Sequence, residues 1–596
     1  MKIDITTFDG IRPRVGAHLL DNGMATIARN VRIGSGMLKP LGVMRDLFVN
    51  VPQDTKSIYH WQDDWLFYSD ARSFAPGPAK SYSEEQEDED GDALAKERNE
   101  RRLFISNDDA GGLYVYRKNA TYWKLGVPAP TTAPTVETTS NPKSSSTKET
   151  RVYVYTYVNS LGQESAPSPA SETIDVQGQK VKVSGINGDV AQITADGYCP
   201  ILFIRIYRLA VGNEDAGYLL VNVKSNDGQG TAVSKNSYTD KISDRDLGEA
   251  LPSLGWRAPS EELKMITAVG NGSYAAFVDN EVRFSQPLYP YAWPDALSHV
   301  LEYEIVGMVR SSVYLYIFTK GSVYYMSVDD VTSSVPVKME GIYPCLSAQG
   351  IVSIPGGAVF PCQDGLYFVG AGYSKPFKIS SPYFDEPQWA ALWPAQARGA
   401  YSNGVLYYFL AQPKWMGSAG LLMKLGVDEG GNATIQNMTS TDAPVDIPYT
   451  DDNDGFLYCK SGTSLLRWEG DVNTGEPESK SNMEAAWQSK SFLTGNKVNF
   501  SCAIVEQGIE DDPVYEVKES QYEAVQDDLP KMNEPQNYTR VIFFRNGKEF
   551  YRREITDREA FVLPAGFTGR TLQLRIETNV WVRRVAVAES MAELFA

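Results

Sequence analysis

Short apolar runs rich in Tyr, Phe and Val recur along the chain, each behind a polar turn that contains Gly, Asn or Asp. Six copies of this phrase lie at 63–68, 111–116, 321–325, 364–368, 403–408 and 454–458. Aromatic and β-branched side chains suit a pleated, half-buried strand. Asn-Gly and Asp-Gly supply the positive φ angles that a two-residue hairpin turn needs. The pattern therefore predicts a chain built from aromatic hairpins.

The spacing of the later copies indicates a larger repeat. From Gly321, the corresponding glycines Gly365, Gly404 and Gly455 follow at intervals of 44, 39 and 51 residues, by subtraction of their positions. Four-stranded propeller blades recur at about 40–50 residues. We therefore expect a β-propeller-like body, a fold that narrows function without fixing it.

A different pattern interrupts this repeat. Residues 131–150 form a Thr/Ser-rich linker, and residues 152–158 then place aromatic side chains at alternate positions, as in a strand. More short strands follow, at 201–208 and 218–223, separated by turns. This arrangement is typical of a β-sandwich of about 100 residues. It resembles a fibronectin type III module.

The module is predicted to be an insertion into the repeat. Gly112 and Gly272 are 160 residues apart, and removing the 120 residues 131–250 leaves 40, the length of one blade. The predicted fold class is thus mainly β, with a β-propeller-like body, an inserted fibronectin-III-like β-sandwich and a small C-terminal β domain.

Five segments follow from this interpretation. They are an N-terminal docking segment (1–50), the first part of the propeller-like body (51–130), the inserted sandwich (131–255), the remainder of the body (256–470) and the C-terminal β domain (483–596). Within the first segment we expect a short helix between extended pieces. An acidic run at 84–92, with seven acids in nine positions, is expected to form a loop.

Length and composition fit a large protein with several cores. At 596 residues the chain is too long for one core, and its 42% hydrophobic residues can fill more than one. No apolar run reaches the roughly 18 residues of a membrane span, and the first residues lack the apolar core of a secretion signal. The five cysteines are scattered, which favours reduced, mostly buried thiols in a protein made in a cytoplasm.

Motifs for catalysis are missing from the sequence. The three histidines are far apart, and we find no HExxH, GxSxG, Walker or GxGxxG pattern. We therefore predict a protein that is not an enzyme and has no cofactor or metal site. Carboxylates that converge in a propeller channel stay open as an alternative, because 75 acids offer many candidates.

The charge distribution points to contacts with other proteins. The formal net charge of −19 argues against a broad grip on nucleic acid, because neutralising phosphates requires an excess of Lys and Arg. Two segments are basic nevertheless: residues 1–45 hold seven Lys/Arg against three Asp, and residues 540–584 hold ten Lys/Arg against five Asp/Glu. The first is either solvated or docked on an acidic neighbour. The second could contact phosphates, but in an acidic protein it favours acidic surfaces of another subunit or domain.

The candidate subunit-interface residues are taken from these two basic segments. They are Arg12, Arg14, Arg583 and Arg584.

Several short sequence segments resemble a known family. Residues 10–14 through 30, and residues 36–41, look like the start of tail nozzle proteins of short-tailed bacteriophages, also called tail tubular protein B. The centre is similar at 284–287, 292–294, 317–324, 343–345 and 364–367, and the C-terminus at 583–588 and 591–594. The resemblance touches both ends and the centre, although its motifs are structural and not catalytic.

The resemblance implies a structural virion protein of the phage tail, synthesised in the host cytoplasm. It implies a homohexameric tube that is attached to a head-to-tail adaptor protein and serves as a conduit for genome ejection. Phage DNA would pass through the lumen without specific contacts, and tail fibres or spikes are further partners that the family allows. The alternatives are a non-catalytic receptor- or glycan-binding propeller, and a glycan-degrading tail enzyme.

Overall fold

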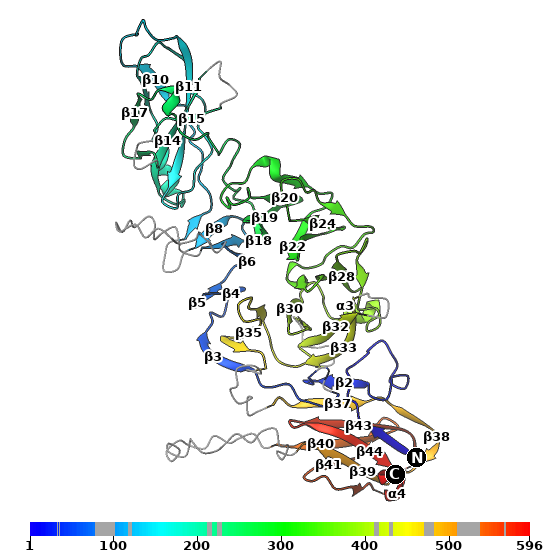
Figure 1. The fold of residues 1–596 in the computed structure, drawn as a ribbon. Helices are drawn as coiled ribbons and strands as arrows, with labels where there is room; N and C mark the ends of the chain where they lie inside the picture. Colours follow the sequence, from blue (N-terminus) through cyan, green and yellow to red (C-terminus); the bar gives the residue numbers. More distant parts are fainter. Residues whose placement is uncertain are drawn as a thin grey trace, which may run out of the picture. The chain divides into compact units, whose positions relative to one another are not determined.

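The computed structural model describes residues 1–596 apart from 33, 35, 63, 78–101, 117–121, 211–216, 223–228, 411–416, 428–432, 470–481, 509–536 and 565–567. The predicted acidic loop at 84–92 lies outside the described residues. The protein is mainly β, as predicted. It forms two compact units: unit 1 comprises Met1–His60 and Met339–Ala596, and unit 2 comprises Trp61–Lys338. Figure 1 shows their strands, coloured along the sequence.

Unit 2 contains three four-stranded antiparallel sheets in which consecutive strands are neighbours, as in propeller blades. The first sheet comprises β6 (Arg72–Pro76), β7 (Leu103–Asn107), β8 (Leu113–Tyr116) and β9 (Trp123–Lys124). The second comprises β18 (Lys264–Gly270), β19 (Ser273–Val278), β20 (Glu281–Phe284) and β21 (Ser298–Val300), with the 3-10 turn η3 (Asp295–Leu297) before β21. The third comprises β22 (Ile305–Ser311), β23 (Tyr314–Thr319), β24 (Val323–Ser327) and β25 (Val337–Lys338).

Apolar cores join these sheets in sequence order. Phe104 and Val115 of the first sheet share a buried cluster with Tyr274 of the second. Phe284 of the second sheet shares another with Ile317 of the third. Because the inner strands are apolar on both faces, each sheet packs against its neighbours, which is how blades of a propeller cohere.

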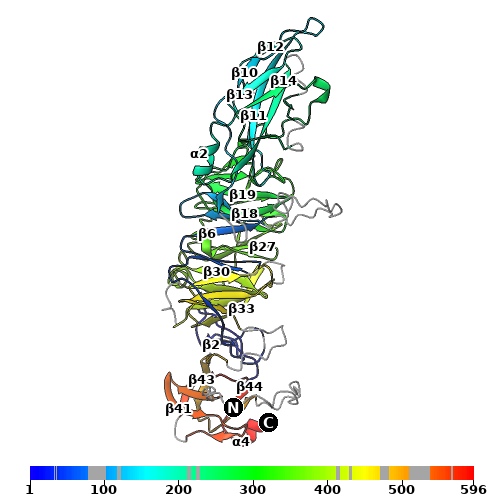
Figure 2. The same ribbon diagram turned by 90° about the vertical axis from the view of Figure 1, so that its left-hand side faces the viewer.

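The insertion forms a two-sheet sandwich. One sheet comprises β10 (Thr135–Thr138), β13 (Val181–Ser184) and β17 (Ser237–Asp240). The other comprises β12 (Ile174–Val176), β11 (Glu149–Asn159), β14 (Ile201–Ala210) and β15 (Leu219–Leu220), with β16 (Thr231–Ala232) also on β14. The short helices α2 (Val190–Ala195) and η2 (Asp244–Asp246) complete it. Figure 2 shows the long strands β11 and β14 running together.

The alternating aromatics of the predicted strand at 152–158 fill this sandwich. Tyr153, Tyr155 and Tyr157 of β11 are fully buried and pack with Ile204 and Ile206 of β14. Side chains two residues apart lie on the same face of a strand, so the alternation places all three rings in the core.

Unit 1 contains two further four-stranded sheets. One comprises β26 (Val352–Ile354), β27 (Gly357–Pro361), β28 (Leu366–Gly370) and β29 (Phe377–Lys378), preceded by η4 (Ala348–Gly350) and followed by helix α3 (Glu386–Ala390). The other comprises β34 (Ile447–Thr450), β35 (Leu457–Ser461), β36 (Ser464–Arg467) and, from the beginning of the chain, β3 (Arg45–Asn50). A strand from far away in the sequence thus completes the second sheet.

The largest sheet of unit 1 continues from a third meander into the C-terminal β domain. In order it comprises β30 (Arg398–Ser402), β31 (Val405–Phe409), β32 (Gly420–Val427), β33 (Ala433–Thr441), β2 (Ala25–Arg29), β37 (Ala485–Ser489), β43 (Gly569–Thr578), β40 (Thr539–Arg545) and β41 (Lys548–Glu554), with β38 (Phe492–Val498) also on β43. A smaller sheet comprises β1 (Lys2–Ile5), β44 (Val582–Ala588), β39 (Cys502–Gln507) and β42 (Phe561–Val562), and helix α4 (Met591–Phe595) packs on it.

All six predicted aromatic runs are strands. They are β5 (Asp64–Tyr68), which follows β4 (Ser57–Trp61), and β8, β24, β28, β31 and β35. The position of the run within its sheet varies, however: β24 and β28 are third strands, whereas β31 is a second strand. This difference accounts for the short interval of 39 residues between Gly365 and Gly404.

The predicted positive-φ turns are confirmed at some sites and wrong at one. Asn403 and Gly404 have φ values of 50° and 81°, as a type I′ hairpin requires. Gly365 does not have a positive φ. An added Cβ there would lie 2.5 Å from Cε of Lys378 and 2.6 Å from Oγ of Ser380, so a larger residue would shift these side chains.

The expected helix in residues 1–50 is wrong. The described part of this segment holds β1, β2 and β3 and no helix. Each strand pairs with a distant part of unit 1: β1 with β44, β2 with β37 and β33, and β3 with β36. The segment shows no helical period because its apolar residues alternate into these sheets.

Asn30 holds this N-terminal segment in place. Its residue is almost fully buried, with a φ of 55°. The amide nitrogen of the side chain donates to Oδ1 of Asp442 at 2.7 Å and to the carbonyl of Glu484 at 2.9 Å. Its side-chain oxygen accepts from the Thr441 hydroxyl at 3.0 Å and from the amide of Asp442 at 3.2 Å. One amide side chain therefore connects the ends of β2 and β33 with the residue before β37.

Replacing this side chain is expected to destabilise unit 1. Asn30→Ala removes the buried hydrogen bonds and should lower the free energy of unfolding by about 2–4 kcal/mol. Asn403→Ala is the matched control, because Asn403 has the same left-handed backbone in an exposed turn. Urea unfolding of both variants measures the difference. Equal losses would show that backbone strain alone, and not the hydrogen bonds, is responsible.

The insertion contains a buried ion pair. Nη1 of Arg208 donates to Oδ2 of Asp240 at 2.7 Å, and both side chains are completely buried. The Tyr153 hydroxyl donates to the same carboxylate oxygen at 2.9 Å. The pair fixes β14 of one sheet against β17 of the other, since burial leaves either charge without water if its partner is lost.

Asp240→Ala should therefore destabilise the insertion by about 3 kcal/mol, because it removes the fully buried carboxylate from the Arg208 guanidinium and leaves only the more exposed Asp244 paired with it. Glu137→Ala, which breaks the exposed pair with Lys182 in the same domain, should cost less than about 1 kcal/mol. Hydrogen exchange of the β11 and β14 amides in the full chain measures the loss of stability in both variants. Unchanged protection in Asp240→Ala would contradict the role of the pair.

Candidate functional site

The candidate site is a pocket of about 220 Å³ in unit 2, where the chain enters the insertion after the first sheet and leaves it before the second. Residues from four segments line it: 110–114 before and in β8, 124–125 at and after the end of β9, Tyr198 from the insertion, and 259–261 before β18. These segments are distant in sequence, and backbone hydrogen bonds bring them together.

Two backbone contacts form the frame of the pocket. The amide of Lys124 donates to the carbonyl of Gly197 at 2.9 Å, which ties β9 to the insertion. The amide of Gly112 donates to the carbonyl of Leu263 at 2.9 Å. Gly111 allows the closest approach: it has a φ of 85°, and an added Cβ would lie 2.8 Å from the carbonyl oxygen of Glu261. A larger residue at this position would push the pocket walls apart.

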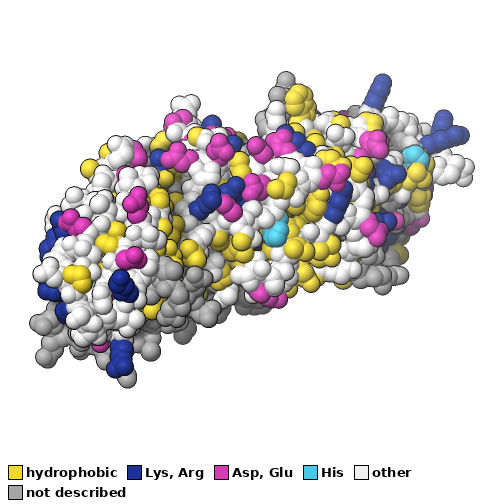
Figure 3. Space-filling model, turned by 90° about the horizontal axis from the view of Figure 1, so that it is seen from above, with side chains coloured by type: hydrophobic (Ala, Val, Ile, Leu, Met, Phe, Trp, Pro, Cys, Tyr) yellow, Lys and Arg dark blue, Asp and Glu magenta, His cyan; other side chains and the backbone are white. Residues whose placement is uncertain are grey.

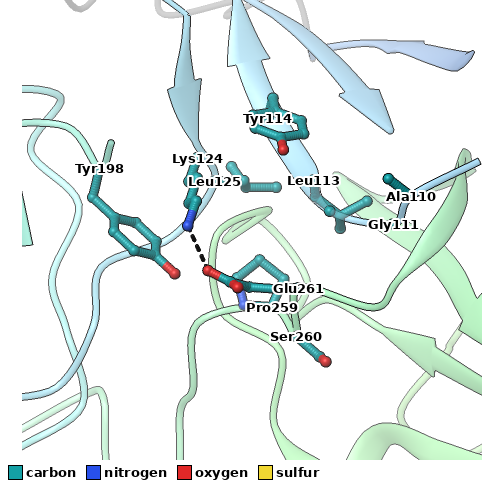
Figure 4. A pocket seen from close by; sticks show the side chains of 11 residues that line it. Ala110, Gly111, Leu113, Tyr114, Lys124, Leu125, Tyr198, Pro259, Ser260 and Glu261 are labelled. Atoms are coloured by element: carbon teal, nitrogen blue, oxygen red, sulfur yellow. Dashed lines mark hydrogen bonds and ion pairs between the residues drawn. The ribbon is translucent and has the colours of Figure 1, made fainter. Parts of the chain in front are cut away.

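An ion pair lies inside the pocket. Nζ of Lys124 is 2.5 Å from Oε1 of Glu261. This hydrogen bond raises the pKa of Lys124, so that the ammonium stays charged throughout the physiological range. The same Nζ is 5.4 Å from the ring centroid of Tyr198. Figure 4 shows the Tyr198 hydroxyl directed toward the pair, with the Tyr114 ring on another side of the pocket.

Tyr114 and Tyr198 supply aromatic walls with polar tips. The Tyr114 ring stacks on Tyr122 with centroids 4.7 Å apart, which fixes its orientation. Burial raises the pKa of Tyr198, so its hydroxyl stays protonated near neutral pH. The pocket therefore offers hydroxyl donors, an ammonium group and a carboxylate around a small volume.

The lining of this pocket is poor in carboxylates. Of the residues that line it, only Glu261 carries a carboxylate. Glycoside hydrolysis usually uses a pair of carboxyl groups. In the described part of the chain there is also no group of three His, Cys, Asp or Glu side chains that could hold a metal ion. All five cysteines are free and buried, as the sequence predicted.

Sequence reasoning missed the pocket, because its residues lie far apart and match no motif. One signal could have found it. If 131–250 is an insertion, its two ends must meet, and Lys124 and Glu261 lie just outside those ends. The predicted insertion thus indicated where the pocket lies, but not which side chains form it.

The predicted interface residues lie at two places in unit 1. Arg12 has its guanidinium carbon 5.7 Å from the ring centroid of Tyr383, and Arg14 donates a hydrogen bond to the carbonyl of Ser381. Arg584 donates to both oxygens of Asp4 at 2.8 Å and to Glu506 at 2.9 Å. Arg12 and Arg14 therefore both contact residues 381–383 of their own chain.

Arg583 differs from its neighbour. The register of β39 and β44 shifts at this point, where Glu506 opposes Arg584 and Gln507 opposes Val582. Arg583 is thus the extra residue of a β-bulge, and its side chain is exposed. Figure 3 shows one face of the molecule, on which acidic and basic side chains are interspersed.

Several arginines of 540–584 are paired with carboxylates within the fold. Arg540 pairs with Glu554 and Glu577, and Arg552 with Glu549. The sequence window also omits Asp4 and Glu506, which the fold brings to Arg584. Much of the predicted basic row therefore serves strand pairing.

The comparisons with known proteins give no family. No family model matches the chain, and no curated protein does. Among solved structures, the AfRom2 CNH domain aligns at 7% identity and a TM-score of 0.22, over 48% of this chain and 86% of that domain. PorZ, a surface component of the type-IX secretion system of Porphyromonas gingivalis, aligns at 12% and 0.20, over 65% of this chain and 42% of its own. Hsv2 of Kluyvelomyces marxianus aligns at 10% and 0.18, over 38% and 70%.

TM-scores this low support no transfer of function, so the fold rests on the strands described above. No helix in the described residues has the length and apolar character to cross a membrane.

Arg584 should give the small sheet an acid sensitivity. Its hydrogen bonds lower the pKa of Asp4, so the pair stabilises the fold above the ordinary Asp pKa and this contribution is lost as the pH falls through the lowered value. Arg584→Met should cost about 1 kcal/mol at pH 7 and less in acid. Urea unfolding of wild type and variant at pH 7 and pH 3 measures the change. Arg558→Met is the control, because this exposed arginine donates to the backbone carbonyl of Gln507, and an equal pH effect in both variants would contradict the assignment.

Proposed function

We propose that this chain is a structural virion protein that forms the distal tail tube, or nozzle, of a short-tailed bacteriophage. In this role, copies of the chain assemble into a ring of six below an adaptor ring, and the phage genome passes through the lumen. The protein acts in the virion after synthesis in the host cytoplasm. It performs no catalysis.

The observation that carries the proposal is where the family-like phrases lie in the fold. Gly10 belongs to the first phrase, and an added Cβ there would lie 1.9 Å from the carbonyl oxygen of Met438. Asn30 is the buried connector between strands, and Arg584 fastens β44 to β1 and β39. A resemblance concentrated at such joints favours a shared scaffold and a structural role.

Physical properties of the chain agree with a conduit. Sheets packed through apolar cores make rigid walls, and identical heterologous contacts between copies close into a ring. A net charge of −19 disfavours adsorption of DNA, so that a passing genome would slide along the protein.

The competing function is a receptor- or glycan-binding propeller without catalysis. The pocket of unit 2 is the specific observation in its favour, because it offers polar and aromatic groups to a small ligand. A glycan-degrading enzyme has less support, since the pocket carries a single carboxylate. The two leading candidates differ in assembly: a nozzle forms a closed ring, whereas a binding module functions as separate copies.

Native mass spectrometry and negative-stain imaging of the purified chain, alone and with its adaptor protein, test the proposal. We expect closed rings of six copies. Arg583→Glu should shift the population toward monomers, because it reverses an exposed charge beside the β44 bulge, and Lys548→Glu is the control at another exposed strand position. A chain that stays monomeric at high concentration, both alone and with the adaptor, would overturn the nozzle. Rings that are unaffected by Arg583→Glu would remove only this contact.

A further inference from the structure

We infer that the pocket between the insertion and the first sheet of unit 2 binds a single neutral pyranose ring, either a free sugar or the end of a glycan. The inference rests on the charge, the polar groups and the size of the pocket. It does not depend on the nozzle, since a binding site can lie on a structural protein.

The charge of the pocket selects a neutral ligand. Lys124 and Glu261 neutralise one another at 2.5 Å. An anionic ligand would be attracted to the ammonium but repelled by the carboxylate beside it. A cationic ligand would be attracted to the carboxylate but repelled by the ammonium. A ligand with hydroxyl groups can use both, because a hydroxyl donates to the carboxylate and accepts from the ammonium.

The remaining polar groups of the pocket are hydroxyls. Those of Tyr114 and Tyr198 have no hydrogen-bond partner among the described residues. The Ser260 hydroxyl accepts from the amide of Glu262 at 3.3 Å and keeps its own proton for donation. A ligand with several hydroxyl groups around a compact ring can satisfy such an array, whereas an apolar ligand would leave it unpaired.

The aromatic walls and the volume limit the ligand to one ring. About 220 Å³ lies below the roughly 300–1,000 Å³ of pockets for drug-sized molecules. The stacked Tyr114–Tyr122 pair presents a rigid ring at one side. The apolar C–H faces of a pyranose can pack against such a ring while its hydroxyls reach the polar groups. The structure thus offers both kinds of contact that a sugar ring needs.

The location adds a mechanical consequence. Tyr198 belongs to the insertion, Tyr114 to the first sheet and Glu261 to the segment that leads into the second sheet. A ring bound to all three would hold these segments together. We therefore expect slower hydrogen exchange in β9 and around Tyr198 when the site is occupied.

Saturation-transfer NMR with the full-length protein and methyl glycosides of glucose, galactose, mannose and N-acetylglucosamine tests the inference. At least one glycoside should show transfer, and Tyr198→Phe, which removes a single hydroxyl, should weaken its binding by about tenfold. Glu261→Gln should weaken it further, because the variant leaves the Lys124 charge unbalanced. Tyr289→Phe, at a tyrosine of unit 2 outside the pocket, is the matched control and should bind as wild type does.

Two outcomes would overturn the inference. One is the absence of transfer from every glycoside at millimolar concentration. The other is transfer that Tyr198→Phe and Glu261→Gln leave unchanged. An oligosaccharide with the preferred ring at its end distinguishes the sources: tighter binding than the monosaccharide indicates a surface glycan, and exclusion of the longer chain indicates a free sugar. Ring assembly of Tyr198→Phe, followed by native mass spectrometry, separates this result from the nozzle, because lost sugar binding should leave assembly intact.

Discussion

The fold of unit 1 depends on one strand that arrives from the beginning of the chain. β2 lies between β33 and β37, and without it the meander that ends at β33 and the C-terminal sheet that begins at β37 would each expose an edge. Unpaired strand edges expose backbone donors and acceptors and invite pairing with other chains. The buried hydrogen bonds of Asn30 keep β2 in register at this point. A segment that reads as a loose basic arm is therefore the central connection of the sheet.

In unit 2, by contrast, the chain leaves the four-stranded sheets to form the insertion and then returns to them. Two crossings connect the insertion with the propeller-like sheets: one follows β9 and the other precedes β18. The backbone hydrogen bonds of Lys124 and Gly112 hold these two crossings in place. A pocket results because the two crossings meet around an ion pair and two tyrosines instead of a packed apolar core. The same geometry that accommodates the sandwich thus creates a candidate binding site.

Much of the fold could be predicted from the sequence, because local patterns reflect local forces. The aromatic runs became strands, and alternation in β11 placed Tyr153, Tyr155 and Tyr157 in one core. Contacts between distant segments could not be predicted in this way. A count of charges along 540–584 missed Asp4, which pairs with Arg584 only in the fold. The pocket escaped for a related reason: the predicted insertion brings the neighbourhoods of Lys124 and Glu261 together, but nothing in the sequence indicates that these two side chains pair or that Tyr198 joins them.

The close approach of the two crossings has an evolutionary consequence. An added Cβ on Gly126 would lie 2.6 Å from Cδ of Pro259, so the chain enters and leaves the sandwich at almost one point. A module attached at such a point can be lost, replaced or lengthened by recombination while the ladder hydrogen bonds of the blade stay intact. The sandwich is in this sense an exchangeable cassette, and related scaffolds are expected to differ most at this site.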